Sequence, residues 1–367
     1  MRVAIAGGSL GGLFAGALLR RDGHEVTIHE RSRNGLEGRG AGLVPQEEVF
    51  AILRVLGRSD VAGTGVAARD RITLDRAGGI AHRDARSQMQ ISWDGLYLAV
   101  RDLLPDGCYR AGATVDAAGS DGDCAWLCTA DGGRVEADLV IGADGIGSGV
   151  RGSMFAPREV QPLYAGYVAW RFLLPETDLA PVSVATLSER FAFYHMTGGQ
   201  ALGYLVAGPR GEIEPGRRRY NCVWYRRVAD LPGLLVDRRG EPHLYSLPRG
   251  SVPTDVRDRL VRDARDLLPP PFAAIVEAEP EPFMQAIFDL EAPRMIEGRL
   301  ALLGDAAFIA RPHTAMGVAK AAGDAMALAD ALRREPVDAA LRSYDAERSR
   351  VGRAIVQYGR RLGAGLE

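Results

Sequence analysis

The chain has 367 residues, which is enough for two domains or for one large domain with a closely packed insertion. Its 47% hydrophobic and 25% charged residues are typical of a globular protein and argue against disordered, fibrous and membrane classes. With 45 basic and 47 acidic residues the formal charge is -2, so the composition gives no general attraction to nucleic acid or anionic lipid.

The cysteines and the N-terminus indicate the compartment. Cys108, Cys124, Cys128 and Cys222 form no CxxC pair and no cluster with metal-ligand spacing, so we predict no metal site. The N-terminus lacks a secretory signal, and no apolar run reaches the roughly 20 residues that span a bilayer. We therefore expect a cytoplasmic protein without membrane or nucleic-acid partners.

The first thirty residues predict a strand, a glycine loop, a helix and a second strand. Arg2 to Ala6 is a short apolar run, Leu13 to Leu19 has helical spacing, and Glu25 to Glu30 is rich in β-branched residues. Between the first strand and the helix, Gly7 to Gly12 (GGSLGG) matches the GxGxxG pattern, with Ser9 in the second glycine position. This βαβ unit is typical of dinucleotide binding.

The dinucleotide prediction follows from the local geometry of such a loop. A helix N-terminus after a glycine turn can hold a pyrophosphate, and an acidic residue at the end of the next strand can bind a ribose hydroxyl. The loop alone does not distinguish NAD from FAD. The predicted cofactor contacts here are Gly7, Ser9, Leu10, Gly12, Glu30 and Arg31.

Later segments predict a small antiparallel meander, a separate sheet and two C-terminal helices. Short alternating runs separated by Gly and Asp fill residues 107 to 140, and aromatic, β-rich runs follow between about 160 and 250. Arg299 to Leu303 is a strand, and Gly317 to Leu332 and Asp338 to Leu362 have helical periodicity. The strand at 299 to 303 indicates a return to the first domain.

Two further motifs select between the dinucleotides. They are Gly142 to Arg151 (GADGIGSGVR) and Leu303 to Ala307 (LGDAA). Alone, either Asp144 or Asp305 could be a helix cap. Together with the glycine loop, the motifs resemble the three fingerprints of the FAD-dependent aromatic hydroxylases, the para-hydroxybenzoate hydroxylase-like family. The resemblance implies that FAD is the cofactor, that Asp305 binds its ribityl chain and that Asp144 braces the site.

A narrower resemblance concerns one branch of that family. Gly166 to Arg171, Arg219 to Tyr225, Gln285 to Arg294 and Gly304 to Lys320 resemble the 2,6-dihydroxypyridine 3-hydroxylase branch. Many other relatives have a GQGxN-like segment where this chain has Gly317-Val318-Ala319-Lys320. The branch implies a hydroxypyridine-like or related polyhydroxylated ring as the substrate, although a family label does not fix the substrate.

The resemblance also implies contacts around the flavin ring. The helix that begins at Gly317 should face the isoalloxazine, where its positive end suits the negative charge of reduced flavin. Lys320, one turn into this helix, is expected to face solvent or to pack, since a lysine there more often does so than acts in catalysis. The remaining predicted FAD contacts are Arg39, Gly40, Arg101, Asp144, Asp305, Pro312, Gly317, Val318 and Ala319.

The implied reaction is a single-component monooxygenation with NAD(P)H as a transient co-substrate and O2 as the oxidant, through a flavin C4a-hydroperoxide. It needs aromatic pocket walls and a group that helps to deprotonate the substrate hydroxyl. The predicted catalytic residues are His195, His313 and Tyr225. Candidates for the walls, or equally for core packing, are Trp170, Tyr194, Tyr204, Trp224 and Tyr225.

Other flavin chemistries remain as alternatives. The chain has no second GxGxxG unit for a lasting nicotinamide domain and no WxWxIP motif of the flavin halogenases. A flavoprotein oxidase or reductase and a non-catalytic flavin-binding redox sensor stay open. Because relatives are often dimers, the resemblance also implies a homodimer.

The predicted fold is a mixed α/β architecture. A Rossmann-like FAD-binding domain would carry an inserted antiparallel β-sheet domain for the substrate and a long C-terminal helix. The expected divisions are residues 1–160 and 283–335 for the FAD-binding domain, 161–282 for the substrate domain and 336–367 for the helix.

Overall fold

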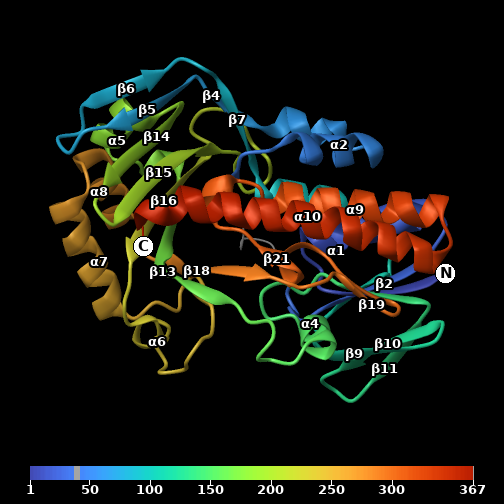
Figure 1. The fold of residues 1–367 in the computed structure, drawn as a ribbon. Coiled ribbons are helices and arrows are strands. Elements are labelled where there is room, and N and C mark those ends of the chain that lie inside the picture. The colour runs from blue at the N-terminus through green and yellow to red at the C-terminus, as the bar shows by residue number, and fades with distance from the viewer. Residues whose placement is uncertain (37–41, 367) are drawn as a thin grey trace.

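The computed structural model of the protein describes residues 1–36 and 42–366. A parallel sheet forms one end of the molecule (Figure 1). Its strands β20, β12, β1, β2 and β8 run parallel, and β19 pairs antiparallel at the edge. The strand order is β19 (Ile296–Glu297), β20 (Leu300–Leu302), β12 (Leu139–Gly142), β1 (Arg2–Ala6), β2 (Glu25–Glu30) and β8 (Tyr109–Ala111).

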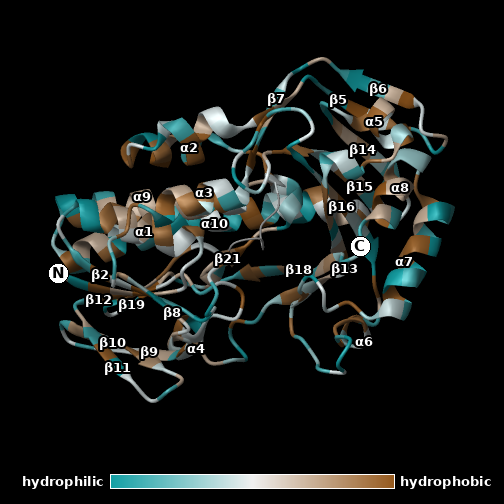
Figure 2. Cartoon of the chain, turned by 180° about the vertical axis from the view of Figure 1, so that it is seen from behind, coloured by the Kyte–Doolittle hydropathy of each residue, from teal (hydrophilic) through white to brown (hydrophobic). Residues whose placement is uncertain are grey.

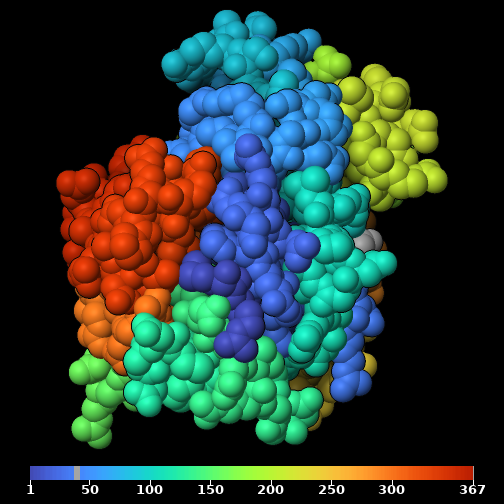
Figure 3. All heavy atoms as spheres, turned by 90° about the vertical axis from the view of Figure 1, so that its right-hand side faces the viewer, coloured from blue at the N-terminus to red at the C-terminus, as the bar shows by residue number. Residues whose placement is uncertain are grey.

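Helices that lie far apart in the sequence pack together over this sheet. The helix after β1 contacts a helix near the C-terminus, which in turn contacts the last helix and a helix that follows β3. Figure 3 shows the C-terminal helices (red) beside the N-terminal segments (blue) at this end of the molecule. These helices are α1 (Leu10–Arg21), α2 (Glu47–Val55), α3 (Trp93–Arg101), α9 (Gly317–Arg334) and α10 (Val337–Gly363).

A large, mainly antiparallel sheet forms the other end. Its order is β17 (Ser246–Leu247), β18 (Phe283–Glu291), β13 (Leu163–Pro175), β16 (Arg219–Arg227), β15 (Gly199–Val206), β14 (Arg190–Met196), β5 (Asp70–Leu74) and β6 (Ile80–Asp84). The short strand β21 (Phe308–Ile309) also pairs with β18. The mixed α/β fold with two sheets and a long C-terminal helix is therefore confirmed.

Strand pairing differs in detail from the sequence-based division. The strands β5 and β6 join the large sheet because β5 pairs parallel with β14, and β18 joins it through β13. The division had placed all three with the FAD-binding unit. Pairing between segments more than 100 residues apart has no local sequence signal, since it depends on which strand at the edge of the sheet is available to pair with the new one.

The two faces of the large sheet have different neighbours. The outer face, which includes Trp170, Phe172 and Trp224, packs against residues such as Leu260 and Phe272 in a separate core. The covering helices are α5 (Pro181–Leu187), α7 (Thr254–Leu267) and α8 (Pro270–Ala278), and Figure 2 shows α7 and α8 on this side. The inner face includes Tyr167 and Tyr225, which contact His313 in the segment before α9.

The long helix α10 joins the two ends of the molecule, as Figure 1 shows. Glycines lie on one side of it, at Gly352, Gly359 and Gly363. A Cβ at Gly352 would overlap the Phe308 ring, and one at Gly363 would meet the Tyr167 hydroxyl at 2.8 Å. This glycine side lets α10 lie directly against the segment before α9 and against the large sheet.

The remaining elements are small. The strands β9 (Val115–Asp121), β10 (Cys124–Thr129) and β11 (Arg134–Ala137) form the predicted meander, and β3 (Gly42–Leu43), β7 (Gln88–Ser92) and β4 (Val66–Ala68) form another small sheet. The short helices α4 (Gly149–Met154) and α6 (Leu231–Leu234) lie in connections. In the part of the chain that the structure describes, no helix combines the length and hydrophobicity of a membrane span.

Candidate cofactor and substrate site

The three sequence motifs meet at one edge of the parallel sheet. Ala6, the last residue of β1, lies opposite Gly142, the last residue of β12, and Gly142 lies opposite Leu302, the last residue of β20. The loops continue the pairing, because the Ala143 N–H donates to the Ala6 carbonyl at 2.8 Å. The carboxyl edge of a parallel sheet is the usual place for a ligand in such folds.

The glycine loop is closed by backbone contacts that leave no space for side chains. Gly7 has a φ of +97°, and a Cβ there would overlap the Ala143 carbonyl oxygen. A Cβ at Gly12 would overlap the carbonyl oxygen of Gly7. The helix α1 begins at Leu10 after Ser9, with no acidic residue in its first turn. Its first N–H groups therefore face an edge suited to a negative charge.

Glu30 holds the glycine loop in place. Its buried carboxylate accepts from the Gly8 N–H at 2.8 Å through Oε2 and from the Ser32 N–H at 2.8 Å through Oε1. Each carboxylate oxygen has a second acceptor site, so these bonds leave capacity for a ribose hydroxyl. Arg31, which follows Glu30, is exposed.

Arg101 reaches the same loop through an aromatic ring. From the last turn of α3, its guanidinium lies 4.3 Å from the centroid of the Tyr109 ring. The Tyr109 hydroxyl donates to the Gly8 carbonyl at 3.2 Å. The structure therefore brings Arg101 to the glycine loop although about ninety residues separate them in the sequence.

Asp144 is both a helix cap and a partly unsatisfied acid. Its Oδ2 accepts from the Gly149 N–H at 2.8 Å and from the Val150 N–H at 3.3 Å, at the start of α4. Its Oδ1 is buried without a hydrogen-bond partner among the described residues. Burial raises the pKa of this carboxyl, which the hydrogen bonds to it oppose. These bonds match the helix-cap alternative, and the role of Asp144 in bracing the cofactor site stays a prediction.

Arg151 ties the second motif to the third. Its guanidinium is buried and donates to the Gly145 carbonyl at 3.3 Å, to the Ile146 carbonyl, and to the Ala306 carbonyl at 2.9 Å. A guanidinium is suited to this because its donors point in several fixed directions. The loops after β12 and β20 are thus held in one arrangement.

Asp305 projects from the short 3-10 turn after β20, with its side chain 54% exposed. The turn is fixed from behind, because the Gly304 N–H donates to Asp324 Oδ2 at 3.0 Å and Arg348 donates to Asp324 Oδ1 at 2.7 Å. Asp324 therefore anchors this turn, and the exposed side chain of Asp305 can reach a ligand.

The start of α9 lies beside this turn. Gly317 is exposed, Pro312 and Val318 are partly buried, and Ala319 is buried. No acidic residue occupies the first turn of α9. Of the two expectations for Lys320, exposure to solvent or packing, the structure shows packing, because its side chain is only 1% exposed and its Nζ lies 3.4 Å from Asp305 Oδ1.

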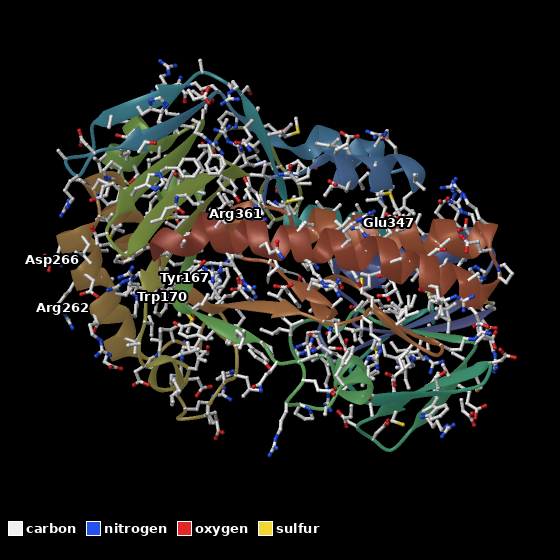
Figure 4. All side chains as sticks on the ribbon, in the orientation of Figure 1. Tyr167, Trp170, Arg262, Asp266, Glu347 and Arg361 are labelled. Atoms are coloured by element: carbon white, nitrogen blue, oxygen red, sulfur yellow. The ribbon has the colours of Figure 1, made fainter. Side chains whose placement is uncertain are left out.

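Two of the predicted catalytic residues meet on the inner face of the large sheet. The ring centroids of His313 and Tyr225 are 4.4 Å apart, and the Tyr167 hydroxyl lies 2.9 Å from His313 Nε2. Tyr167 and Tyr225 are buried, and Figure 4 labels Tyr167 on β13 near the end of α10. Burial, with a smaller effect of the Arg311 charge, lowers the pKa of His313 to about 4. Burial raises the pKa of Tyr225 to about 12.

His195 lies apart from this cluster. It is exposed on β14, where its Nδ1 lies 3.2 Å from the Gln200 amide nitrogen. It shares a row of the sheet with Tyr225, because His195 pairs with Gln200 and Gln200 pairs with Tyr225. The structure thus puts His195 on the inner face, two strands from Tyr225, and does not bring it to His313.

The aromatic wall candidates divide between the two faces. Trp170, Tyr194 and Trp224 pack in the outer core, so ordinary core packing accounts for them. Tyr204 lies in a small cluster on the inner face with Phe191 and Val206. Arg39 and Gly40 fall outside the described residues.

A pocket of about 400 Å³ opens between α2, α9 and α10. Its apolar lining comes from Met316, Ala319, Ile355 and Tyr358, and Lys320 also lines it. This volume is in the range of small-ligand sites. Among the predicted cofactor residues, Ala319 borders this pocket.

The residues at the strand edge fit FAD. The glycine loop provides a backbone cradle for a pyrophosphate, and Glu30 lies at the end of β2 for a ribose. Among the buried polar atoms that have no hydrogen-bond partner in the described part of the chain, Asp144 Oδ1 and Lys320 Nζ belong to the predicted motifs at this edge. Such orphaned groups are rare in an interior unless a ligand or water satisfies them.

Sequence reasoning missed Tyr167 and Tyr109, and it left open whether Lys320 faces solvent or packs. Tyr167 is inside a segment that the sequence analysis quoted, but its partner His313 is 146 residues away. Tyr109 had no signal, since it belongs to an ordinary short strand. Lys320 had one: it is the single lysine of a chain with 45 basic residues.

Comparison with known proteins agrees with this geometry. A family model described as "FAD binding domain" matches residues 273–358, and one described as "FAD binding domain-like" matches residues 164–289. A 2,6-dihydroxypyridine 3-monooxygenase from Paenarthrobacter nicotinovorans is 30% identical over 375 residues, which cover 100% of this chain and 91% of the relative. A 6-hydroxynicotinate 3-monooxygenase from Pseudomonas fluorescens is 24% identical, with 90% of this chain and 82% of that protein covered.

A solved structure has the same fold over the whole chain. The 2,6-dihydroxypyridine-3-hydroxylase from Arthrobacter nicotinovorans superposes with a TM-score of 0.93 at 29% identity, covering 100% of this chain and 92% of that one. The full-length similarity confirms the family that the three motifs indicated. The protein belongs to the family of FAD-dependent monooxygenases that act on aromatic and heteroaromatic compounds.

Proposed function

We propose that the protein hydroxylates a hydroxypyridine-like or phenolic ring, with FAD as its cofactor, NAD(P)H as the transient reductant and O2 as the oxidant. The observation that carries this proposal is the full-length similarity to the 2,6-dihydroxypyridine 3-monooxygenase. The arrangement of an FAD-type strand edge opposite an aromatic sheet face supports it.

The proposed FAD contacts follow from the strand edge. Bound FAD supplies the electron transfer between nicotinamide, oxygen and the ring. The glycine loop and the start of α1 would hold its pyrophosphate, Glu30 its adenosine ribose, and Asp305 its ribityl chain. Arg101 and the start of α9 would flank it.

The substrate would lie against the inner face of the large sheet. Tyr225 and Tyr204 are buried on this face and would provide its aromatic contacts, and the apolar side chains of Val223 and Leu202 lie between them. This side is nearer to the cofactor edge, because His313 immediately precedes α9 and contacts Tyr225. A flat ring stacked here would be shielded from water.

His313 is the group that we propose to exchange a proton with the substrate hydroxyl. Its lowered pKa of about 4 keeps the imidazole neutral near pH 7, so one ring nitrogen is free of a proton. The Tyr167 hydroxyl at 2.9 Å from Nε2 orients the ring and can pass a proton onward. An ionised ring hydroxyl makes the substrate electron-rich, as hydroxylation requires.

The proposal is tested with a panel of hydroxylated pyridines, simple phenols and larger polyketide-like phenols. Each compound is scored by NAD(P)H oxidation, oxygen consumption and the mass of the product. A hydroxylase oxidises NAD(P)H faster with its substrate and adds one oxygen atom per turnover. Flavin reduction by the ring compound alone would indicate an oxidase, and no turnover with any compound would indicate a sensor.

The role of His313 has its own arm. His313→Asn should slow substrate-dependent NAD(P)H oxidation on the order of 10²-fold or more while FAD content stays normal. Supplying the substrate above the pKa of its hydroxyl should restore part of the rate. A variant that turns over at the wild-type rate at every pH would remove His313 from the proposed chemistry.

A further inference from the structure

The protein contains one lysine. Lys320 is the single lysine among 45 basic residues, so the other 44 are arginines. Apart from Lys320 itself and the histidines, arginine therefore provides the basic side chains of this chain. A position that keeps lysine in such a composition indicates a need for its compact, point-like ammonium, which the larger planar guanidinium replaces only in part.

This lysine is buried with its charge incompletely satisfied. The side chain is 1% exposed, and its Nζ makes no hydrogen bond to any residue that the structure describes. The ammonium has three donors, and the nearest anion is Asp305 Oδ1 at 3.4 Å. Because buried donors without acceptors are unfavourable, the site requires a further acceptor.

The neighbouring acid does not meet that requirement. Asp324, one turn along α9, accepts from the Gly304 N–H and from Arg348, and no ion pair joins it to Lys320 within the described residues. The first turn of α9 has no acidic side chain, so the positive end of this 18-residue helix adds to the ammonium. The surroundings of Nζ therefore favour an anionic ligand.

The strand order indicates which part of FAD lies here. The glycine loop after β1 takes the pyrophosphate, and Glu30 at the end of β2 takes the adenosine ribose. Asp305 follows β20, which is three strands from β2 on the opposite side of β1, or about 14 Å at the usual strand spacing. The flavin half must extend in that direction, toward Asp305 and Lys320.

We propose that Lys320 stabilises the negative charge that the isoalloxazine carries when it is reduced. The proposal rests on the proposed FAD-dependent function and names a residue through which the chain sets the redox balance of its cofactor. A fixed cation next to the ring favours the anionic reduced form over the neutral oxidised form. Asp305 then positions the ammonium, and the ligand supplies the missing acceptor.

The test measures the two-electron midpoint potential of the holoenzyme and the dissociation constant of its sulfite adduct, in which the ring is also anionic. In Lys320→Met we expect reduced flavin to bind roughly tenfold less tightly relative to oxidised flavin, a fall of about 30 mV for a two-electron couple. Sulfite affinity should fall about tenfold for the same reason. Unchanged values in a variant with normal FAD content would overturn the proposal.

A double substitution separates a direct effect from one that acts through Asp305. Removing the lysine also leaves Asp305 unpaired, which would itself lower the potential. In an Asp305→Asn background, Lys320→Met should still lower the potential by a similar amount. If the shift disappears there, Lys320 is only the counter-ion of Asp305 and the proposal fails.

Three comparisons complete the design. Lys320→Arg keeps the positive charge, and its midpoint potential should lie between those of the wild type and Lys320→Met. This variant also provides a measurement if the Lys320→Met protein does not fold. Arg350→Gln removes an exposed cation from the same pocket and should change neither value. Weaker binding of oxidised FAD with an unchanged potential would place the lysine on the pyrophosphate and would overturn the proposal.

The outcome does not depend on the ring substrate. Both measurements use the purified holoenzyme without an aromatic compound. A protein that hydroxylates none of the tested rings would refute the proposed function and leave the Lys320 result standing. Conversely, hydroxylation with an unchanged potential in Lys320→Met would refute only the lysine proposal.

Discussion

The cofactor edge and the inner face of the large sheet are built in different ways. At the edge, most contacts involve backbone groups. Gly7 and Gly12 allow neighbouring carbonyl groups to approach closely, and the Glu30 carboxylate accepts from two backbone N–H groups. On the inner face, side chains from separate strands and from the segment before α9 meet, and the contacts among His313, Tyr167 and Tyr225 are between side chains. The edge is therefore intolerant of added atoms, and the inner face is sensitive to the chemistry of particular side chains.

Neighbouring residues on β16 provide the largest test of this difference. Trp224 is buried in the outer core, and Tyr225 faces His313. Trp224→Ala should lower the free energy of unfolding by about 3 to 5 kcal/mol, because it leaves a large cavity. Tyr225→Phe keeps the ring and should change the free energy of unfolding by less than about 1 kcal/mol, while the rate of substrate-dependent NAD(P)H oxidation falls. Urea unfolding and steady-state kinetics of both variants would test this difference between the outer core and the inner face. An equal loss of stability in the two variants would refute it.

The glycine loop provides a second test at the cofactor edge. Gly7→Ala combines a positive φ with overlap on Ala143, so it should cost roughly 2 to 4 kcal/mol and abolish FAD retention. The matched control is Gly57→Ala, where φ is +71° but a Cβ meets nothing within 4 Å. The control should lose about 1 kcal/mol and keep its flavin. Thermal unfolding and the flavin absorbance per chain measure both effects. Normal FAD content in Gly7→Ala would show that the loop is not the cradle.

A smaller effect should appear in the pH dependence of stability. Burial lowers the pKa of His313 from 6.5 to about 4, so between these values the unfolded state binds the proton and the folded state does not. Stability should therefore fall as the pH decreases from about 6.5 toward 4, by about 1 to 3 kcal/mol for this residue. His29 should contribute in the same direction, since burial also lowers its pKa to about 4.

Replacement of the histidine isolates its share. His313→Asn should flatten the slope of unfolding free energy against pH, measured by urea titrations at several pH values. His82→Asn, at an exposed site on β6, is the control and should leave the slope as it is. An identical slope in His313→Asn would mean that this imidazole is not held neutral by burial.

The same contrast explains what the sequence could predict. The glycine loop, Asp144 and Asp305 are readable because each motif is contiguous and ends a strand, so parallel pairing alone brings them together. The inner face was only partly predictable. Alternation along β16 separates Trp224 from Tyr225, but which side meets the cofactor depends on η4 (Pro312–Thr314), nearly ninety residues later.

Lys320 shows the opposite case. Local pattern placed it on a helix and left both solvent exposure and packing open, and only tertiary packing decides that it is buried. The composition shows that Lys320 is unusual, because every other Lys or Arg position is arginine. It does not show where the lysine side chain lies in the fold. Only the position of Asp305 gives the lysine a place in the site.

The glycine side of α10 has a consequence for engineering. Gly352 lies against Phe308, and Gly363 lies against Tyr167 and Arg311, so one helix sets the distance between the segment that precedes α9 and the large sheet. Exchange of the large sheet with that of a relative would therefore bring in a foreign surface for this helix. A functional chimera should need the donor's C-terminal helix together with the donor's sheet, so the two elements would have to be exchanged together.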